Sequence, residues 1–143
     1  MIGALRAFGP AIPRPKAREA LRAAVGAGLG LLLTGILLYL ISPTDSFLHH
    51  PLLIAPFAAS AVLIFAVPNS PLAQPWAVVV GNSIAALIGV ATMHLLPMAL
   101  PAGAIAVLIT LLATAALRAT HPPAGAAAMA TVLAYHVDAP TSL

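Results

Sequence analysis

Donor side chains that could hold a small anion gather in two proline-bounded stretches, PNSPLAQP and RATHPP. Hydroxyl, amide, imidazole and guanidinium groups all donate hydrogen bonds, and a helix that starts after a proline adds free N–H groups and the positive end of its dipole. Half-helices that aim their N-termini at an anionic substrate are a known device of transporters. The candidate binding residues are Ser70, Gln74 and Asn82 in or after the first stretch, and Arg118, Thr120, His121 and Gly125 in or after the second.

Arg118 and His121 are the strongest pair in this set. Arg118 is the only basic residue beyond position 22, and it precedes His121 by three positions, a spacing that puts both on one face of a continuing helix. We predict that they form a cationic mouth with the N–H groups after Pro123, where Gly125 permits close backbone approach. The alternative is that Pro122 and Pro123 make only a rigid, helix-starting turn and that Arg118 anchors the chain at the interface. If transport is coupled to protons, His121 is the best candidate, because imidazole changes charge nearest neutral pH.

Asn82 lies about two turns into an apolar stretch, where an amide needs a hydrogen-bond partner. We expect an interhelical hydrogen bond there in preference to a place on a transport path.

Catalysis, metal binding and cofactor binding find little support. Only Glu19, Asp45 and Asp138 carry carboxylates, and none lies in an apolar stretch, so no acid–base pair and no Ser-His-Asp set is expected. Cysteine is absent, which removes thiolate ligands and nucleophiles. Adjacent His49 and His50 cannot easily bind one ion together, even with Asp45 nearby. We therefore expect no enzyme, no metal and no cofactor.

The chain that must position these groups has the composition of a membrane protein. Of its 143 residues, 62% are hydrophobic and 6% are charged, against about a quarter charged in soluble domains. These few charged side chains cannot cover the surface of a soluble protein. The lipid bilayer is therefore the expected solvent. Five of the six basic residues lie in the first 22 positions, which is typical of a cytoplasmic segment beside a membrane. No aromatic residues alternate with them, which argues against nucleic acid.

Proline and charge divide the rest into five apolar pieces, which predict an all-α bundle of about four transmembrane helices. The pieces are 23–41, 52–67, 76–96, 102–117 and 124–135. The first has 19 residues, about 28 Å as a helix, which suffices to cross a bilayer. A signal peptide is the alternative for it, but no convincing cleavage site follows. The last, at about 18 Å, is too short to cross and is expected to be a half-helix, a re-entrant segment or a truncated fifth span.

We expect three parts in the chain: a basic tail over residues 1–22, a transmembrane domain over 23–137 and a short tail over 138–143. Placing the basic tail in the cytoplasm also puts Arg118 on that side. Gly26 and Gly30 form a GxxxG pair, which predicts close helix contact and a homo-oligomer through the first span or its neighbours.

Two long runs resemble the HPP family of small membrane proteins. They are IAPFAASAVLIFAVPNSPLAQPWAVVVGNSIAALIGV, residues 54–90, and LRATHPPAGAAA, residues 117–128, which contains the His121-Pro122-Pro123 triplet that names the family. The resemblance covers about residues 23–133. It implies a compact bundle of about four transmembrane helices, and plastid and cyanobacterial members are associated with nitrite transport. Members often carry a basic residue after AQP, where this chain has Trp76, and sometimes a His at the position of Asn82.

Together these features favour passage of a small inorganic anion, with nitrite as a candidate, across a bacterial plasma membrane. The alternative is a non-transporting membrane scaffold or subunit that positions a partner protein.

Overall fold

The computed structural model describes residues 13–41 and 51–138, which form helices joined by short turns. In chain order the elements are α2 (Ala17–Ile41), α3 (Pro51–Ala66), the 3-10 turn η1 (Pro71–Ala73), α4 (Pro75–Leu95), α5 (Ala99–Ala116) and α6 (Pro122–Asp138). The predicted all-α class is confirmed for these residues. Asp45, His49 and His50, which we weighed as a metal site, lie outside the described residues. So do residues 1–12 of the predicted basic tail and all of the predicted tail 138–143 except Asp138.

Prolines set where the helices begin. Pro51, Pro75 and Pro122 each occupy the first position of a helix, where the missing N–H costs nothing and the fixed φ suits the helix. Ser70 caps η1, because its side-chain oxygen accepts a hydrogen bond from the Leu72 N–H at 3.3 Å. η1 therefore begins at Pro71, after the Ser70 cap, and α4 begins at Pro75.

Three helices, α2, α5 and α6, are longer than the apolar pieces predicted; α5 has 18 residues and begins at Ala99, before the expected start at 102. The last has 17 residues and spans about 25 Å, because it begins at Pro122 and continues past Tyr135. The expectation of a 12-residue piece was therefore too short. α2 begins at Ala17, so its first turns include Arg18 and Arg22 from the basic tail. By length and composition, α2, α4 and α5 are the described helices able to cross a membrane, and α3 and α6 are slightly shorter.

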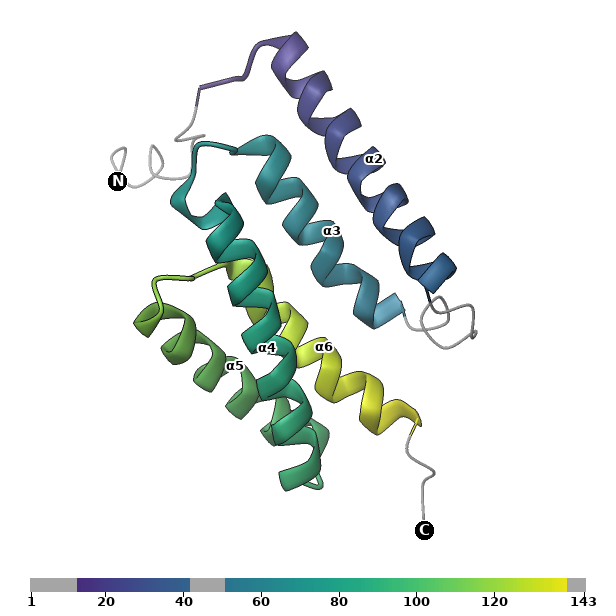
Figure 1. Ribbon diagram of the computed structural model, residues 1–143, viewed down its shortest axis with the longest axis vertical. Coiled ribbons are helices and arrows are strands. Elements are labelled where there is room, and N and C mark those ends of the chain that lie inside the picture. Colours follow the sequence, from purple (N-terminus) through teal and green to yellow (C-terminus); the bar gives the residue numbers. More distant parts are fainter. Residues whose placement is uncertain (1–12, 42–50, 139–143) are drawn as a thin grey trace, which may run out of the picture.

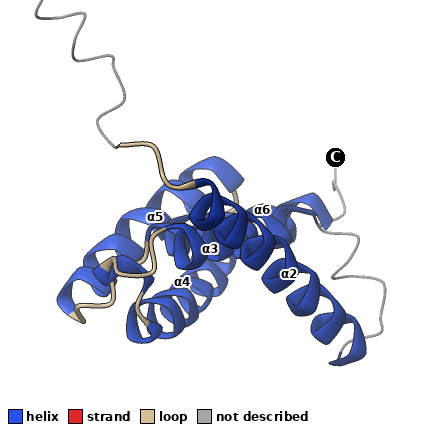
Figure 2. Ribbon diagram, turned by 90° about the horizontal axis from the view of Figure 1, so that it is seen from above, coloured by secondary structure: helices blue, strands red, loops and turns tan. Residues whose placement is uncertain are grey.

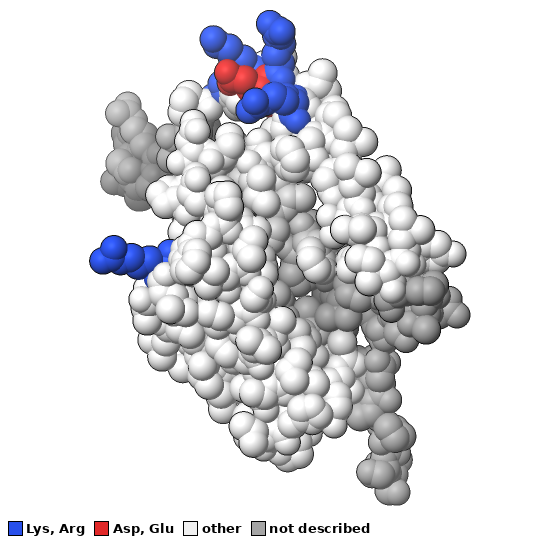
Figure 3. Space-filling model, viewed as in Figure 1, with Lys and Arg blue, Asp and Glu red and all other residues white. Residues whose placement is uncertain are grey.

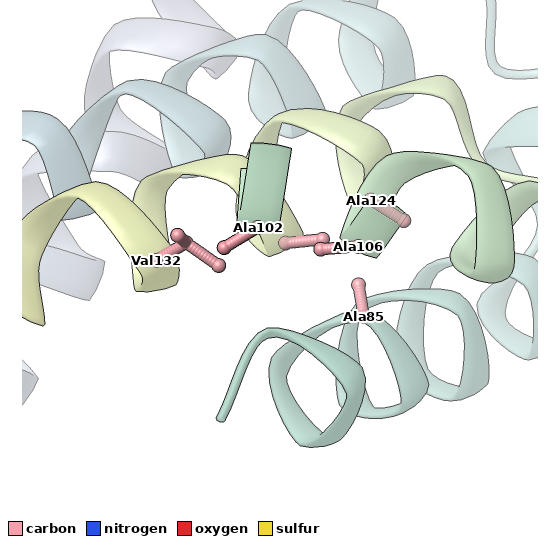
Figure 4. Packing of buried hydrophobic residues seen from close by; sticks show 6 residues of the cluster. Ala85, Ala102, Ala106, Ala124 and Val132 are labelled. Carbon is pink, nitrogen blue, oxygen red and sulfur yellow. The ribbon is translucent and has the colours of Figure 1, made fainter. Parts of the chain in front are cut away.

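Three helices, α4, α5 and α6, pack together through small side chains (Figures 1 and 4). Each helix carries a set of buried residues, most of them small, at intervals of four, which forms a narrow stripe along one face. These stripes are Ala77, Gly81, Ala85 and Gly89 on α4, Ala102, Ala106, Thr110 and Thr114 on α5, and Ala124, Ala128 and Val132 on α6. In lipid no hydrophobic force drives helices together, so close approach of such stripes provides the packing energy.

Large apolar side chains lie on the outside of this core. Leu87, Leu95 and Leu100 are 70%, 77% and 75% exposed. Such exposure would be costly in water but suits a surface that faces acyl chains. The arrangement agrees with a protein embedded in a bilayer.

α2 lies at the edge of the bundle and packs against α3, which in turn packs against α6 (Figures 1 and 2). No residue of α2 is buried. Gly26 and Gly30 face Phe65 of α3, and a Cβ at Gly26 would overlap the Phe65 ring. The predicted use of Gly26 and Gly30 as a contact between copies of the chain is therefore corrected: they bind α3 of the same chain. Gly28 and Gly35 have no neighbour within 4 Å of a Cβ position.

Candidate functional site

His121 lies buried where three elements meet. Its side chain is 2% exposed, at the start of α6. Its Nδ1 lies 2.8 Å from the carbonyl oxygen of Leu72 in η1, and its Nε2 lies 2.9 Å from the hydroxyl oxygen of Ser60 in α3. Gly81 of α4 makes room beside it, because a Cβ there would lie 3.0 Å from the Cβ of His121. The imidazole therefore ties α3, η1 and α6 together against α4.

The acceptor on Leu72 decides which nitrogen of His121 carries the proton. A carbonyl oxygen accepts hydrogen bonds and cannot donate, so Nδ1 must be the protonated nitrogen. In the neutral ring Nε2 then accepts a hydrogen bond from the Ser60 hydroxyl. Both nitrogens are therefore engaged within the protein, and the ring offers no free donor to an anion.

The N-terminus of α6 has fewer free donors than a usual helix start. The first two helical residues, Pro122 and Pro123, have no N–H, and the N–H of Ala124 donates to the carbonyl of His121 at 2.8 Å. Gly125 points toward α5, where an added Cβ would meet Val107 Cγ1 at 3.8 Å. The start of α6 therefore offers fewer N–H groups to an anion than the sequence suggested, and the role of Gly125 in binding one stays a prediction.

Arg118 closes the C-terminus of α5 in a left-handed conformation, with φ of 53°. Its N–H donates to the carbonyl of Ala115 at 3.1 Å, and the Ala119 N–H donates to the carbonyl of Thr114 at 2.8 Å. These two bonds make a Schellman motif, in which this position is usually glycine. The left-handed turn breaks the helix between Arg118 and His121, so the two do not share a helical face. The Arg118 side chain is exposed, whereas His121 is buried.

Trp76 joins the turn at Arg118 to the start of α4. Its indole N–H donates to the carbonyl of Leu117 at 3.1 Å. In the described part of the chain, the backbone N–H groups of Trp76 and Ala77 have no partner, as is usual in a first helical turn. The bond from Trp76 thus holds the turn at Leu117 and Arg118 beside the N-terminus of α4, which follows η1 in the chain.

The other candidates mostly serve local structure. Gln74 donates to the carbonyl oxygens of Pro68 and Ser70, both at 3.2 Å, and so holds the turn before α4 together. Asn82 donates to the carbonyl of Val78 at 2.9 Å, within its own helix, so the predicted interhelical bond is wrong. Thr120 is half-buried in the turn before His121.

Sequence reasoning missed Ser60, Trp76 and the carbonyl of Leu72. Ser60 could have been found, because it is the only polar side chain in the apolar run of α3. The role of Trp76 and of Leu72 depends on contacts across 41 and 49 positions of sequence, which no local pattern shows.

Comparison with known proteins gives the family. The profile described as "HPP, transmembrane region" matches residues 12–141, nearly the whole chain. The chain belongs to the HPP transmembrane family. This confirms the resemblance of the two long runs, and with it an integral membrane protein that contacts the lipid bilayer.

Two curated relatives of this HPP chain come from Dictyostelium discoideum, and both are described as transmembrane proteins. One is 35% identical over 109 residues, which cover 73% of this chain and 34% of the relative. The other is 40% identical over 85 residues, which cover 57% of this chain and 30% of the relative. The chain therefore spans about a third of the length of these relatives. No solved structure matches it.

Proposed function

We propose that this HPP chain passes a small inorganic anion, with nitrite as the candidate, across the membrane. The observation that carries the proposal is the arginine in the left-handed turn after α5. Glycine adopts φ of 53° freely, whereas other residues are strained there by about 1 kcal/mol or more. An arginine at a position that suits glycine supports a use for its charge.

The neighbours of Arg118 suit an anion. The free N–H groups at the start of α4 and the positive end of the α4 dipole lie at the same end, joined through the bond from Trp76 to Leu117. A guanidinium binds a small planar oxyanion such as nitrite with two parallel hydrogen bonds. The Arg118 guanidinium and the free N–H groups at the start of α4 therefore replace the predicted pair of Arg118 and His121 as the place where the anion first binds.

Nitrite uptake into proteoliposomes tests the proposal. Arg118→Asn removes the charge but suits the turn, because Asn tolerates a positive φ. We expect this variant to raise the half-saturating nitrite concentration about tenfold, which corresponds to about 1.4 kcal/mol for a lost charged hydrogen bond.

Arg14→Asn is the matched control, because Arg14 is an exposed cation ahead of α2 and its loss changes net charge equally. We expect uptake by this control at the parent rate. Equal losses in both variants would contradict a specific role for Arg118, and no uptake by the parent above empty liposomes would overturn the transport proposal.

The same proposal includes an orientation, with the start of α2 at the cytoplasmic face of a bacterial plasma membrane. The native chain has no cysteine, so single cysteines can be introduced cleanly. Asn69→Cys and Arg118→Cys should react with an impermeant thiol reagent from the cytoplasmic side, and Met98→Cys, in the turn between α4 and α5, from the opposite side. Labelling of residues 69 and 118 from different sides would contradict it.

We also propose that the chain forms a homo-oligomer. The support is that α2 buries none of its side chains within the described chain. The mass of the protein in lipid nanodiscs tests this, and a monomer there would overturn it.

The second candidate is a membrane scaffold that positions a partner. Its support is the tight interior: a Cβ at Gly89 would lie 2.8 Å from the Thr131 Cβ, and one at Gly81 would lie 2.8 Å from the Ala119 carbonyl oxygen. Helices in such contact leave no open path between α4 and α6. Absence of anion uptake by correctly folded protein would favour this candidate.

A further inference from the structure

An open cleft of about 1100 Å³ lies between the start of α2 and the end of α3. One wall is the first two turns of α2 and the segment before it, and the other is the last turn of α3 with Pro68 and Asn69. The site around Arg118 does not contribute to its walls. The cleft therefore needs an explanation apart from the proposed anion path.

Positive charge lines one wall of the cleft. Lys16, Arg18 and Arg22 are among the lining residues, and Glu19 is the one acidic residue beside them. Arg18 and Arg22 are four positions apart and so lie on one face of α2. Within the described chain, no ion pair neutralises these cations. Figure 3 shows most of the visible Lys and Arg side chains gathered at this end of the molecule around an acidic group, with a further basic side chain projecting elsewhere and the rest of the visible surface uncharged.

The floor of the cleft is apolar. Ala23, Phe65 and Ala66 line it, and Ala23 begins the uncharged part of α2. The Phe65 ring sits against Gly26 and Gly30, which fixes the spacing of α2 and α3 just below the charged wall. Beyond this floor α2 exposes apolar side chains such as Leu29 and Leu33, at 53% and 64%. The cations suit the anionic headgroup of a phospholipid, and the apolar, exposed part of α2 suits its acyl chains.

We propose that this cleft binds the phosphate headgroup of an anionic phospholipid, with the acyl chains lying along α2. Arginine guanidinium groups bind phosphate oxygens in bidentate fashion, and lysine adds a point charge. A free phosphate ion would use the same cations but would gain nothing from the apolar floor or from α2. The lipid is therefore the occupant that accounts for both parts of the cleft.

Native mass spectrometry of the full-length chain in detergent tests this with two lipids, phosphatidylglycerol and phosphatidylcholine. We expect the parent to retain phosphatidylglycerol preferentially. Arg22→Gln should weaken its binding about fivefold, since one cation near an anionic surface contributes about 1 kcal/mol. Arg22→Lys keeps the charge and should lose less. Arg14→Gln removes an equal charge outside the cleft and should bind like the parent.

Circular dichroism and a single gel-filtration peak confirm that each variant is folded. Equal binding of the two lipids by the parent would overturn the proposal. Equal weakening by Arg22→Gln and Arg14→Gln would overturn it too, because it indicates attraction by net charge alone. Displacement of phosphatidylglycerol by inorganic phosphate would instead identify the free ion as the ligand.

Discussion

Replacing His121 by alanine is expected to lower the free energy of unfolding by about 2–4 kcal/mol. Two hydrogen bonds are lost, one buried and one part-buried, each worth about 0.6–1.7 kcal/mol inside a membrane protein, and a cavity is left between α3, η1 and α6. The Leu72 carbonyl and the Ser60 hydroxyl also lose their partner. Unfolding by titration with SDS, followed by far-ultraviolet circular dichroism, measures the change.

Ser60→Ala is the matched comparison, because it removes only the bond to Nε2 and leaves the bond from Nδ1 to Leu72 in place. We expect it to cost about 1 kcal/mol, clearly less than His121→Ala. If His121→Ala unfolded at the parent's SDS concentration, the buried imidazole would not be a structural tie between the helices. Nitrite uptake by His121→Ala should fall only as far as the folded fraction falls.

Gly89→Ala is expected to destabilise the protein by about 1–3 kcal/mol, because an added methyl overpacks a close helix contact. Its Cβ would lie 2.8 Å from the Thr131 Cβ and 2.9 Å from the Ala128 carbonyl oxygen. A carbonyl of the α6 backbone cannot move without shifting the helix, so α4 and α6 must separate. The same SDS titration measures the effect.

Gly28→Ala makes the same chemical change on α2, where a Cβ meets nothing within 4 Å. There the substitution should be neutral or stabilise by up to about 1 kcal/mol, because alanine favours helix. A clear loss of stability for Gly89→Ala and no loss for Gly28→Ala are therefore expected. A loss of stability at Gly28 as large as that at Gly89 would show that α2 is covered by something other than lipid.

Much of the fold was determined by the sequence alone. Low charge and long apolar runs require a bilayer as solvent, and in a bilayer the backbone must pair its own hydrogen bonds within helices. Prolines at positions 51, 75 and 122 fix helix starts because their missing N–H is harmless only there. The length of α6 was underestimated. Proline can occupy the first position of a helix, and polar residues near a membrane surface can extend its end.

The tertiary structure decided which groups meet. Helices that are apolar all round show no preferred inner face, and small residues occur along each of them, so the sequence could not tell that Gly26 and Gly30 bind Phe65 while Gly28 faces outward. Local spacing placed His121 beside Arg118 on the assumption of a continuous helix. The left-handed turn at Arg118 separates them, and packing brings His121 instead to Ser60, 61 positions away. Such pairings depend on the rotation and axial offset of whole helices, which only their packing sets.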